Sequence, residues 1–257
     1  MANRNSLQRR NYILEQLSLA GEVWVEQLAK QLNTSEVTIR KDLSALEEEG
    51  KLLRRYGGAV PLPQHTNAQL VCRYKQAIAQ LAAQLVKDNS RIIIDSGNTT
   101  SALAMELNAK QNLVIMTNSL KVASQVLDLA SEPTLLMTGG TWDAISESLQ
   151  GNIAEQVVNS YDFDQLFIGA DGIDLTKGTT SFHELLSLSQ TMANNAKQVI
   201  VMLEADKIGR KIPNIELTWD KIDILITDDR LDKTIQQQII QCGIQVLSAT
   251  LSQPEVN

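Results

Sequence analysis

Cysteine is scarce in this chain of 257 residues, and long apolar runs are missing. The two cysteines, Cys72 and Cys242, lie far apart, and neither has a second Cys or His at metal-ligand spacing. We therefore expect two reduced thiols, no disulfide framework, and no metal or cofactor. Because no window of about 18 residues is wholly apolar and residues 1–10 lack the apolar core of a signal peptide, we expect a cytoplasmic protein with no membrane contact.

An excess of positive charge is also missing, since the formal net charge is −7. The charge is unevenly distributed: residues 1–60 carry nine Lys and Arg against eight Asp and Glu, whereas residues 61–257 carry fourteen against twenty-two. A uniformly basic nucleic-acid-binding surface is thereby excluded. A local one within the first 60 residues is not, because binding depends on where the charges lie as well as on their sum.

Two styles of sequence meet near Pro61 and Pro63. Short amphipathic segments rich in charge precede this point, and apolar runs that alternate with helical patterns follow it. The prolines and the polar run Gln64–Gln69 are typical of a linker. We therefore predict a first domain at residues 1–60, a linker at 61–71 and a second domain at 72–257.

The first 60 residues have the pattern of three helices followed by a hairpin. The third helix has a favourable N-cap in Ser35 and a favourable stop in Gly50. Residues 52–60 read as a strand, a tight Gly-Gly turn and a second strand. The apolar spacing predicts helices that end near Ala20, that run over about Val25–Leu32, and that run over about Ser35–Glu49.

The third helix is expected to have two different faces. At about 100° per residue, Ile39, Leu43 and Leu46 fall on one side and should be buried. The other side carries hydroxyl, guanidinium and ammonium groups, which suit base edges in a DNA major groove, and the basic hairpin suits the DNA backbone or minor groove. The candidate DNA-binding residues are Ser35, Thr38, Arg40, Lys41, Arg54 and Arg55.

At these positions the chain resembles the DeoR family of bacterial transcriptional repressors. The resemblance is carried by Thr38–Leu43, by Leu46 and Gly50, and by Arg55–Ala59 of the hairpin. It implies a winged helix-turn-helix whose third helix enters double-stranded operator DNA. It also implies groove-facing roles for the candidates on that helix and backbone contacts for those of the hairpin.

The second part of the chain alternates predicted strands with predicted helices. Most strands are continuous apolar runs, as in a sheet covered on both faces, so the pattern predicts a mostly parallel α/β domain. The strand candidates are Arg91–Asp95, Leu113–Thr117, Thr134–Thr138, Gln165–Ile168, Gln198–Leu203, Ile222–Thr227 and Gln245–Ser248. The helix candidates are Thr99–Leu107, Leu120–Leu129, Asn152–Asn159, Glu184–Asn195 and Asp232–Cys242.

Small polar loops follow four of these strands. Ligands of open parallel sheets bind beyond the carboxyl ends of the strands. Hydroxyl groups and a helix N-terminus suit a phosphate, and the carboxylates of Asp95 and Asp171 suit sugar hydroxyls. The candidate effector-binding residues are Asp95, Ser96, Gly97, Asn98, Thr99, Thr100, Asn118, Gly139, Gly140, Asp171, His183, Glu184 and Lys207.

The family resemblance extends over these loops and so over nearly the whole chain. It implies a second domain similar in fold to ribose-5-phosphate isomerase, a phosphorylated sugar or sugar alcohol as effector, and a homo-oligomer, dimer or tetramer. Residues 169–214 look most similar to repressors of glucitol (sorbitol) operons, which implies a ligand such as glucitol 6-phosphate. The chain departs from the family pattern at Glu204–Lys207, where Asp-Ser-Ser-Lys is usual, at Asp143–Ala144 after an aromatic residue, and at Leu149–Gln150.

Two other functions stay open at this point. Asp171, Lys177 and Glu184 resemble an isomerase trio for proton transfer, which would suit a sugar-phosphate isomerase with an accessory DNA-binding head. The reduced loop at Gly178–Thr180 and the presence of the head argue against it. An activator is the second alternative, because the direction of control depends on where the operator lies. The interpretation that the residues favour is a non-enzymatic repressor of a sugar or sugar-alcohol operon, released by a phosphorylated sugar or polyol.

Overall fold

The computed structural model describes residues 2–20, 22–48, 51–55, 57–61, 65–182, 186–210 and 212–251. Contacts between residues divide the chain into two compact units, Met1–Gln69 and Leu70–Asn257. None of the described helices combines the length and the apolar character that crossing a bilayer requires.

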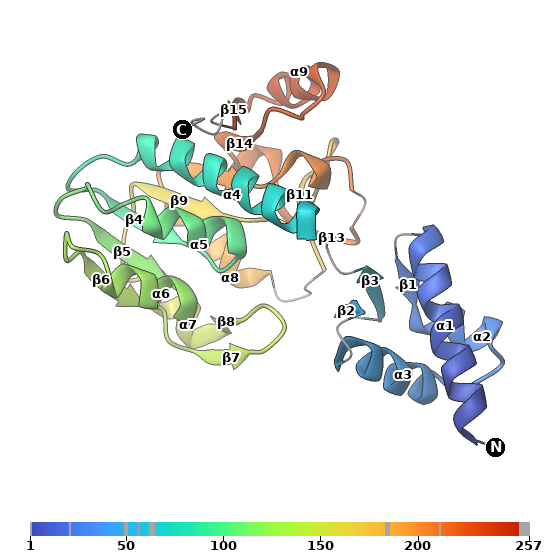
Figure 1. The fold of residues 1–257 in the computed structure, drawn as a ribbon. Helices are drawn as coiled ribbons and strands as arrows, with labels where there is room; N and C mark the ends of the chain where they lie inside the picture. The colour runs from blue at the N-terminus through green and yellow to red at the C-terminus, as the bar shows by residue number, and fades with distance from the viewer. Residues whose placement is uncertain are drawn as a thin grey trace, which may run out of the picture. The chain divides into compact units, whose positions relative to one another are not determined.

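The first unit packs three helices against a small antiparallel sheet (Figure 1). Apolar side chains from the helices and the sheet share one core, in which Ile39, Leu43 and Leu46 are almost fully buried, as predicted. The helices are α1 (Ala2–Ala20), α2 (Val25–Gln31) and α3 (Glu36–Glu48). The strands, in sheet order, are β1 (Val23–Trp24), β3 (Gly58–Pro61) and β2 (Leu52–Arg55). The three helices and the hairpin are confirmed, whereas the two residues of β1 are too few to show a strand pattern.

Helix α4 spans His65–Leu85 and therefore begins inside the predicted linker. Residues 65–71 of the predicted linker are helical, and residues 62–64 lie outside the described part of the chain, so the linker stays a prediction. A polar run without Pro or Gly can also open a helix whose later turns pack. Those later turns bring Ile78, Ala79 and Ala82 into a hydrophobic core.

The seven predicted strands of the second unit form one sheet in which every neighbouring pair is parallel. Successive side chains face opposite sides, so Ile92 and Ile94 belong to one core cluster and Ile93 to the other. In sheet order the strands are β15 (Gln245–Ala249), β14 (Ile224–Asp228), β12 (Val199–Met202), β9 (Gln165–Ile168), β4 (Arg91–Ile94), β5 (Val114–Thr117) and β6 (Thr134–Met137).

Helices cover both faces of this sheet, which confirms the mostly parallel α/β domain. The first face carries α4 together with α5 (Asn98–Met105) and α6 (Leu120–Leu127), which lie in front of the sheet in Figure 1. The second face carries α7 (Asn152–Val158), α8 (Ser187–Asn194) and α9 (Lys233–Gln241). Each face therefore buries the alternate set of strand side chains.

Several smaller elements were not predicted, because their strands are short and polar. A hairpin joins β7 (Thr141–Asp143) to β8 (Ser148–Gln150). A three-stranded antiparallel sheet contains β10 (Gly172–Asp174), β11 (Gly178–Ser181) and β13 (Asn214–Thr218). Two short 3-10 helices are η1 (Ala205–Lys207) and η2 (Trp219–Lys221). Of these elements, β7, β8, β11, η1 and β13 each contribute a lining residue to the cavity described below.

The burial of α3 predicts the effect of truncating its inward face. Leu43 is 1% exposed, so Leu43→Ala should lower the free energy of unfolding of the first unit by about 2–5 kcal/mol. Val37 on the same helix is 60% exposed, so Val37→Ala should change it by no more than about 0.5 kcal/mol. Hydrogen exchange of α3 amides in the full chain measures both values, and equal losses would contradict the assignment of faces.

Candidate nucleic-acid interface and ligand pocket

Helix α3 begins at the N-cap that the sequence predicts. The backbone N–H of Thr38 donates to the Ser35 Oγ at 3.2 Å, and the two hydroxyl oxygens are 2.9 Å apart. This bond satisfies one of the amides that the first turn of a helix leaves without an internal acceptor. The hydroxyls of these two candidates are therefore engaged with each other at the exposed start of the helix.

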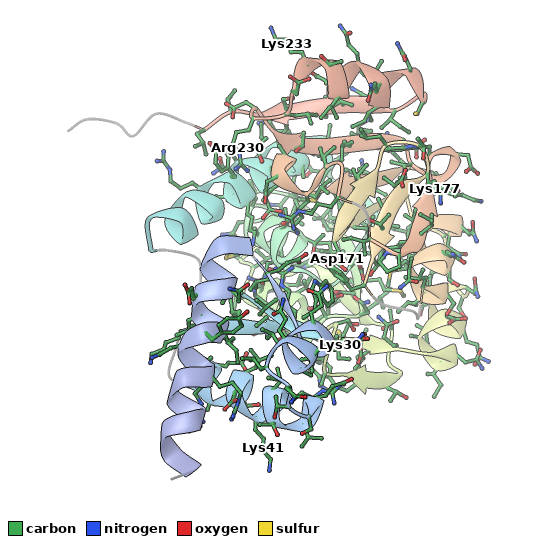
Figure 2. All side chains as sticks on the ribbon, turned by 90° about the vertical axis from the view of Figure 1, so that its right-hand side faces the viewer. Lys30, Lys41, Asp171, Lys177, Arg230 and Lys233 are labelled. Carbon is green, nitrogen blue, oxygen red and sulfur yellow. The ribbon has the colours of Figure 1, made fainter. Side chains whose placement is uncertain are left out.

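The outward face of α3 carries cationic and apolar groups. Arg40 is exposed, and its Nη2 lies 2.7 Å from the Glu36 Oε2 one turn earlier. An exposed pair of this kind is worth only about 0.2–1 kcal/mol, so a nucleic acid can replace the carboxylate. Lys41 is exposed and extends away from the body of the unit in Figure 2. Together with the exposed methyl groups of Val37, this surface has the chemistry of major-groove recognition.

The sequence reasoning missed Asp42, which fixes the orientation of α3. Its side chain is 3% exposed and accepts from the Nε groups of Arg9, and of Arg10 at 3.2 Å, both on α1. A buried carboxylate with two guanidinium partners resists rotation of one helix against the other, because breaking the pair leaves a buried charge. A single acidic residue within a basic stretch gave no signal of this role.

The hairpin is closed by two glycines with different tasks. Gly57 has φ of 75°, a conformation that other residues rarely adopt. At Gly58 an added Cβ would lie 2.1 Å from the carbonyl oxygen of Val23, so a side chain would prevent β3 from pairing with β1. Arg55 lies opposite Gly58 and is exposed. The side chain of Arg54 lies outside the described residues.

The second unit contains a cavity of about 460 Å³ beyond the carboxyl ends of the central strands. Loops after β4, β5, β9 and β12 contribute to its lining, as the position of ligands in open parallel sheets requires. Eight of the thirteen predicted effector-binding residues line it: Asp95, Ser96, Gly97, Asn98, Thr99, Thr100, Asp171 and Lys207.

The loop after β4 presents amide and hydroxyl groups. Gly97 has φ of 142°, and α5 begins at the next residue, so the first N–H groups of the helix have no acceptor within it. The Oγ1 of Thr100 donates to the Gly97 carbonyl at 3.1 Å. Lys121 on α6 lies at this loop, where its Nζ donates to Asn98 Oδ1 at 2.9 Å. These groups provide the donors and the positive charge that a phosphate requires.

Asn118 supports this loop without lining the cavity. It is 1% exposed, and its Nδ2 donates to Asp95 Oδ1 at 2.8 Å while its Oδ1 accepts from the Ser96 N–H at 2.9 Å. Its amide side chain therefore fixes both residues that follow β4. Asn118 is not among the lining residues because its hydrogen bonds turn it into the protein interior, and its part in effector binding stays a prediction.

Gly139 and Gly140 do not line the cavity either. At Gly140 an added Cβ would lie 2.5 Å from the Gln150 carbonyl oxygen, so this glycine permits the close approach of the hairpin β7–β8. The hairpin itself was missed. It places the half-exposed Trp142 and the exposed Ile145 along the cavity, and nothing in the alternation of polar and apolar residues indicated that.

The predicted isomerase trio is not assembled in the described residues. Asp171 lines the cavity, whereas Lys177 lies in the turn between β10 and β11 and does not (Figure 2). His183 and Glu184 lie outside the described residues. The described residues contain no group of three or more His, Cys, Asp and Glu side chains arranged to hold a metal ion.

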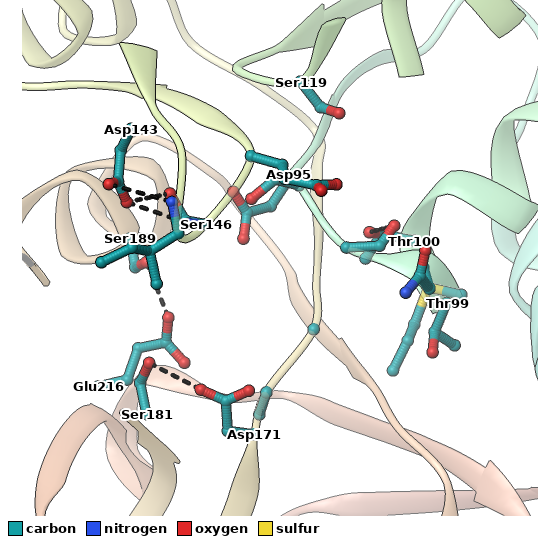
Figure 3. Close-up of a pocket in the computed structure, with 18 of the residues that line it drawn as sticks. Asp95, Thr99, Thr100, Ser119, Asp143, Ser146, Asp171, Ser181, Ser189 and Glu216 are labelled. Carbon is teal, nitrogen blue, oxygen red and sulfur yellow. Dashed lines mark hydrogen bonds between the residues drawn. The ribbon is translucent and has the colours of Figure 1, made fainter. Parts of the chain in front are cut away.

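The carboxyl groups of Asp171 and Glu216 lie away from residues 99 and 100 in the cavity, whereas Asp95 is the first residue of the β4 loop. Figure 3 shows Thr99 and Thr100 to one side of Asp95, and Asp171 and Glu216 to the other. Asp171 accepts from the Ser181 hydroxyl at 3.1 Å and from the backbone N–H of residue 182 at 3.0 Å. The cavity therefore has a side rich in donors and a side rich in carboxylates.

Glu216 on β13 was missed, because it lies within a strand, far along the chain from the polar loops. Its Oε1 accepts from the Ser189 hydroxyl at 2.9 Å. Burial, followed by the negative charges of Asp95 and Asp171, raises the pKa of Glu216 to about 8. At neutral pH this carboxyl can therefore donate a hydrogen bond.

Together the two units have the design of a ligand-responsive DNA-binding regulator: a winged helix joined to an α/β domain with a polar cavity. The DeoR-like helix-turn-helix domain family matches residues 9–64, and the DeoR C terminal sensor domain family matches residues 72–229. The chain therefore belongs to the DeoR family of transcriptional regulators, which are not enzymes.

Among its curated relatives is the putative aga operon transcriptional repressor of Escherichia coli O157:H7, 32% identical over 93% of this chain and 93% of the relative. The glycerol-3-phosphate regulon repressor of Escherichia coli K12 is 27% identical over 93% of this chain and 96% of the relative. Ribose 5-phosphate isomerase A from Methanocaldococcus jannaschii aligns with 52% of this chain and 53% of its own, at 19% identity and a TM-score of 0.39. A likeness at that score carries no argument about function.

Glu216 makes the stability of the second unit depend on pH. Its pKa of about 8 exceeds the ordinary Glu value of 4.5, so between these pH values the folded state holds a proton that the unfolded state has lost. Its contribution to stability is fully present below the lower value and is lost as the pH rises through the higher one. Glu216→Gln should therefore reduce the loss of stability measured by urea unfolding between about pH 5.5 and about pH 8.5.

The matched control is Glu15→Gln, which changes an exposed carboxyl on α1. It should retain the pH dependence of the unmodified chain. If Glu216→Gln retained it too, the carboxyl would be ionised throughout this range, and its role as a hydrogen-bond donor would be refuted.

Proposed function

We propose that this protein is a repressor of a sugar or sugar-alcohol operon, and that a phosphorylated sugar or polyol in the cavity releases it from its operator. The first unit, the DNA-binding head, recognises DNA through residues of α3 and of the hairpin: Ser35, Thr38, Arg40, Lys41, Arg54 and Arg55. The second unit, the sensor unit, controls the affinity of the head for the operator. A ligand that binds better to a DNA-incompetent arrangement shifts the population away from the operator.

The observation that carries this proposal is the division of the cavity into two chemical sides. Amides and hydroxyls of residues 96–100, with Lys121 beside them, suit a phosphate. Asp95 and Asp171 accept hydrogen bonds from hydroxyls, and Glu216 can accept or donate one. A molecule with a phosphate at one end and several hydroxyls at the other matches this arrangement.

The names of the relatives support the same ligand class. One is a repressor of an aga operon, and another is a repressor of a glycerol-3-phosphate regulon. We propose glucitol 6-phosphate as the first ligand to test, on the similarity of residues 169–214 to glucitol-operon repressors. We further propose that a homo-oligomer presents two or more heads to operator half-sites.

Replacement of Arg40 tests the DNA interface. Arg40→Ala should weaken binding of the full chain to an operator duplex, selected by that chain from random DNA, by about 1–3 kcal/mol, which is about 5–150-fold. Lys30→Ala is the matched control, since Lys30 on α2 is also exposed and pairs with a Glu four residues earlier, Glu26, at 2.7 Å. Fluorescence anisotropy measures both. Equal losses of operator affinity in the two variants would show that only the general positive charge matters. Unchanged affinity of Arg40→Ala would show that Arg40 does not contact the DNA.

Thermal shifts of the full chain test the ligand. Glucitol 6-phosphate should raise the melting temperature by mass action, equivalent to about 2.7 kcal/mol at 100 times its Kd, whereas glucitol should not. Asp171→Asn should weaken glucitol 6-phosphate by about tenfold, because one charge-assisted hydrogen bond is lost, and leave inorganic phosphate unaffected. Asp229→Asn, at an exposed aspartate outside the cavity lining, should behave as the unmodified chain. Equal binding of glucitol and its phosphate would refute the phosphate requirement.

A further inference from the structure

Helix α4 connects the two units and also contributes to the cavity. It runs from His65 to Leu85, across the boundary between Gln69 and Leu70. Lys75, near its middle, lines the cavity. Because a helix is held by continuous backbone hydrogen bonds, we expect a displacement of this part of the helix to be transmitted toward its first turn.

Lys75 lies beside a buried carboxylate. Glu204 follows β12 and is 2% exposed, and its two carboxylate oxygens lie 3.4 Å from the Nζ of Lys75 and 3.4 Å from the Nζ of Lys207. Both distances exceed the roughly 2.7–2.9 Å of a charge-assisted hydrogen bond. Glu204 Oε2 is a buried oxygen with no hydrogen-bond partner. Because both lysines also line the cavity, their ammonium groups are shared between Glu204 and the space that a ligand would enter.

The residue before Lys75 attaches the same turn of α4 to neighbouring loops. The Arg230 guanidinium lies over the Tyr74 ring, 3.9 Å from its centroid, and its Nε donates to Asp228 Oδ1 at 2.6 Å. Asp228 in turn accepts from the Ala205 N–H at 2.9 Å. The loop that carries Glu204 and the loop that follows β14 are therefore both tied to one turn of α4.

An anionic ligand would alter this network. A phosphate carries up to two negative charges, against one on Glu204, and an ammonium group placed between them is drawn toward the larger charge. Although burial acts to raise it, Lys207 and Lys75 keep the pKa of Glu204 below its usual value, so the carboxylate stays charged at neutral pH and holds both lysines. Competition for Lys75 therefore acts directly on α4.

We propose that Lys75 couples the cavity to the DNA-binding head: Glu204 holds Lys75 in the operator-binding form, and the anionic group of the effector takes Lys75 from Glu204 and so displaces α4. This inference rests on the proposed function and adds the residue that transmits the signal. It requires that replacing Lys75 reduces the effect of bound ligand on operator affinity, whereas replacing another cavity lysine reduces only the affinity for the ligand.

The coupling factor is the ratio of operator Kd values with and without saturating glucitol 6-phosphate, measured on the full chain. For the unmodified protein this ratio should fall within about 5–150. Lys75→Met should bring this ratio close to one even at saturating ligand. Lys75→Arg, which keeps the positive charge, should give a ratio between that of Lys75→Met and that of the unmodified chain. Lys121→Met is the matched control, since Lys121 lines the same cavity from α6 and donates to Asn98. It should require more ligand but reach the ratio of the unmodified chain.

Glu204→Gln tests the inference without any ligand. It keeps the size of the side chain but removes the charge that holds Lys75, so operator Kd should rise several-fold in the absence of glucitol 6-phosphate. Circular dichroism and thermal unfolding verify that the variant is folded. If it is not, Lys75→Met and Lys75→Arg decide the question by the ratio alone.

The outcomes separate the two proposals. If glucitol 6-phosphate does not shift the melting temperature, the proposed ligand fails, and the effect of Glu204→Gln on operator Kd still decides the role of Lys75. If the ligand binds and releases the operator but Lys75→Met keeps the full ratio, or if folded Glu204→Gln leaves operator Kd unchanged, the coupling role is overturned.

Discussion

The parallel pairing of the central strands is the constraint on which the sensor unit depends. Because all seven strands run in one direction, their carboxyl ends meet at one edge, and the loops after β4, β5, β9 and β12 converge there. Burial of aliphatic side chains on both faces holds the strands in register and makes that edge rigid. The polar residues of the cavity thus stand on a framework whose stability comes from other residues.

The same division of labour occurs in the head. The inward face of α3 contributes Ile39, Leu43 and Leu46 to the core, and the ion pairs of Asp42 fix the helix to α1. Its outward face is then free to carry residues selected for their chemistry. The weak pair between Arg40 and Glu36 suits this role, since an exposed ion pair orients the Arg40 side chain but is easily exchanged for another anion.

Helix α4 is joined to the rim of the cavity by the ion pair between Lys75 and Glu204, which is not needed to hold the helix on the sheet. A fully apolar contact between α4 and the sheet would be a stable way to attach the helix, and the residues around Ile78 provide one. Placing Lys75 and buried Glu204 at the same junction adds an ion pair of little net stabilising value. Such a pair is sensitive to a nearby anion, which an apolar contact is not.

Much of the fold could be predicted, because its signals are local. Each of the seven central strands was visible as an apolar run, and the faces of α3 followed from helical periodicity. The helical conformation of residues 65–71 was not predicted, because a short polar run does not reveal the packing of later turns. The hairpin β7–β8 and the strand β13 were missed because an alternation over only three to five residues is too short to distinguish a strand from a loop.

The amino-acid sequence by itself determined the two-part organisation, the two faces of α3, the parallel sheet and the loop Asp95–Thr100, since each depends on neighbours within a few residues. Only the tertiary structure decided that Asn118 supports that loop from behind, that Lys75 and Glu216 line the cavity, and that Glu204 lies beside Lys75. These residues come from separate helices, loops and strands. Their proximity, and with it the raised pKa of Glu216, follows from long-range packing, which no local pattern encodes.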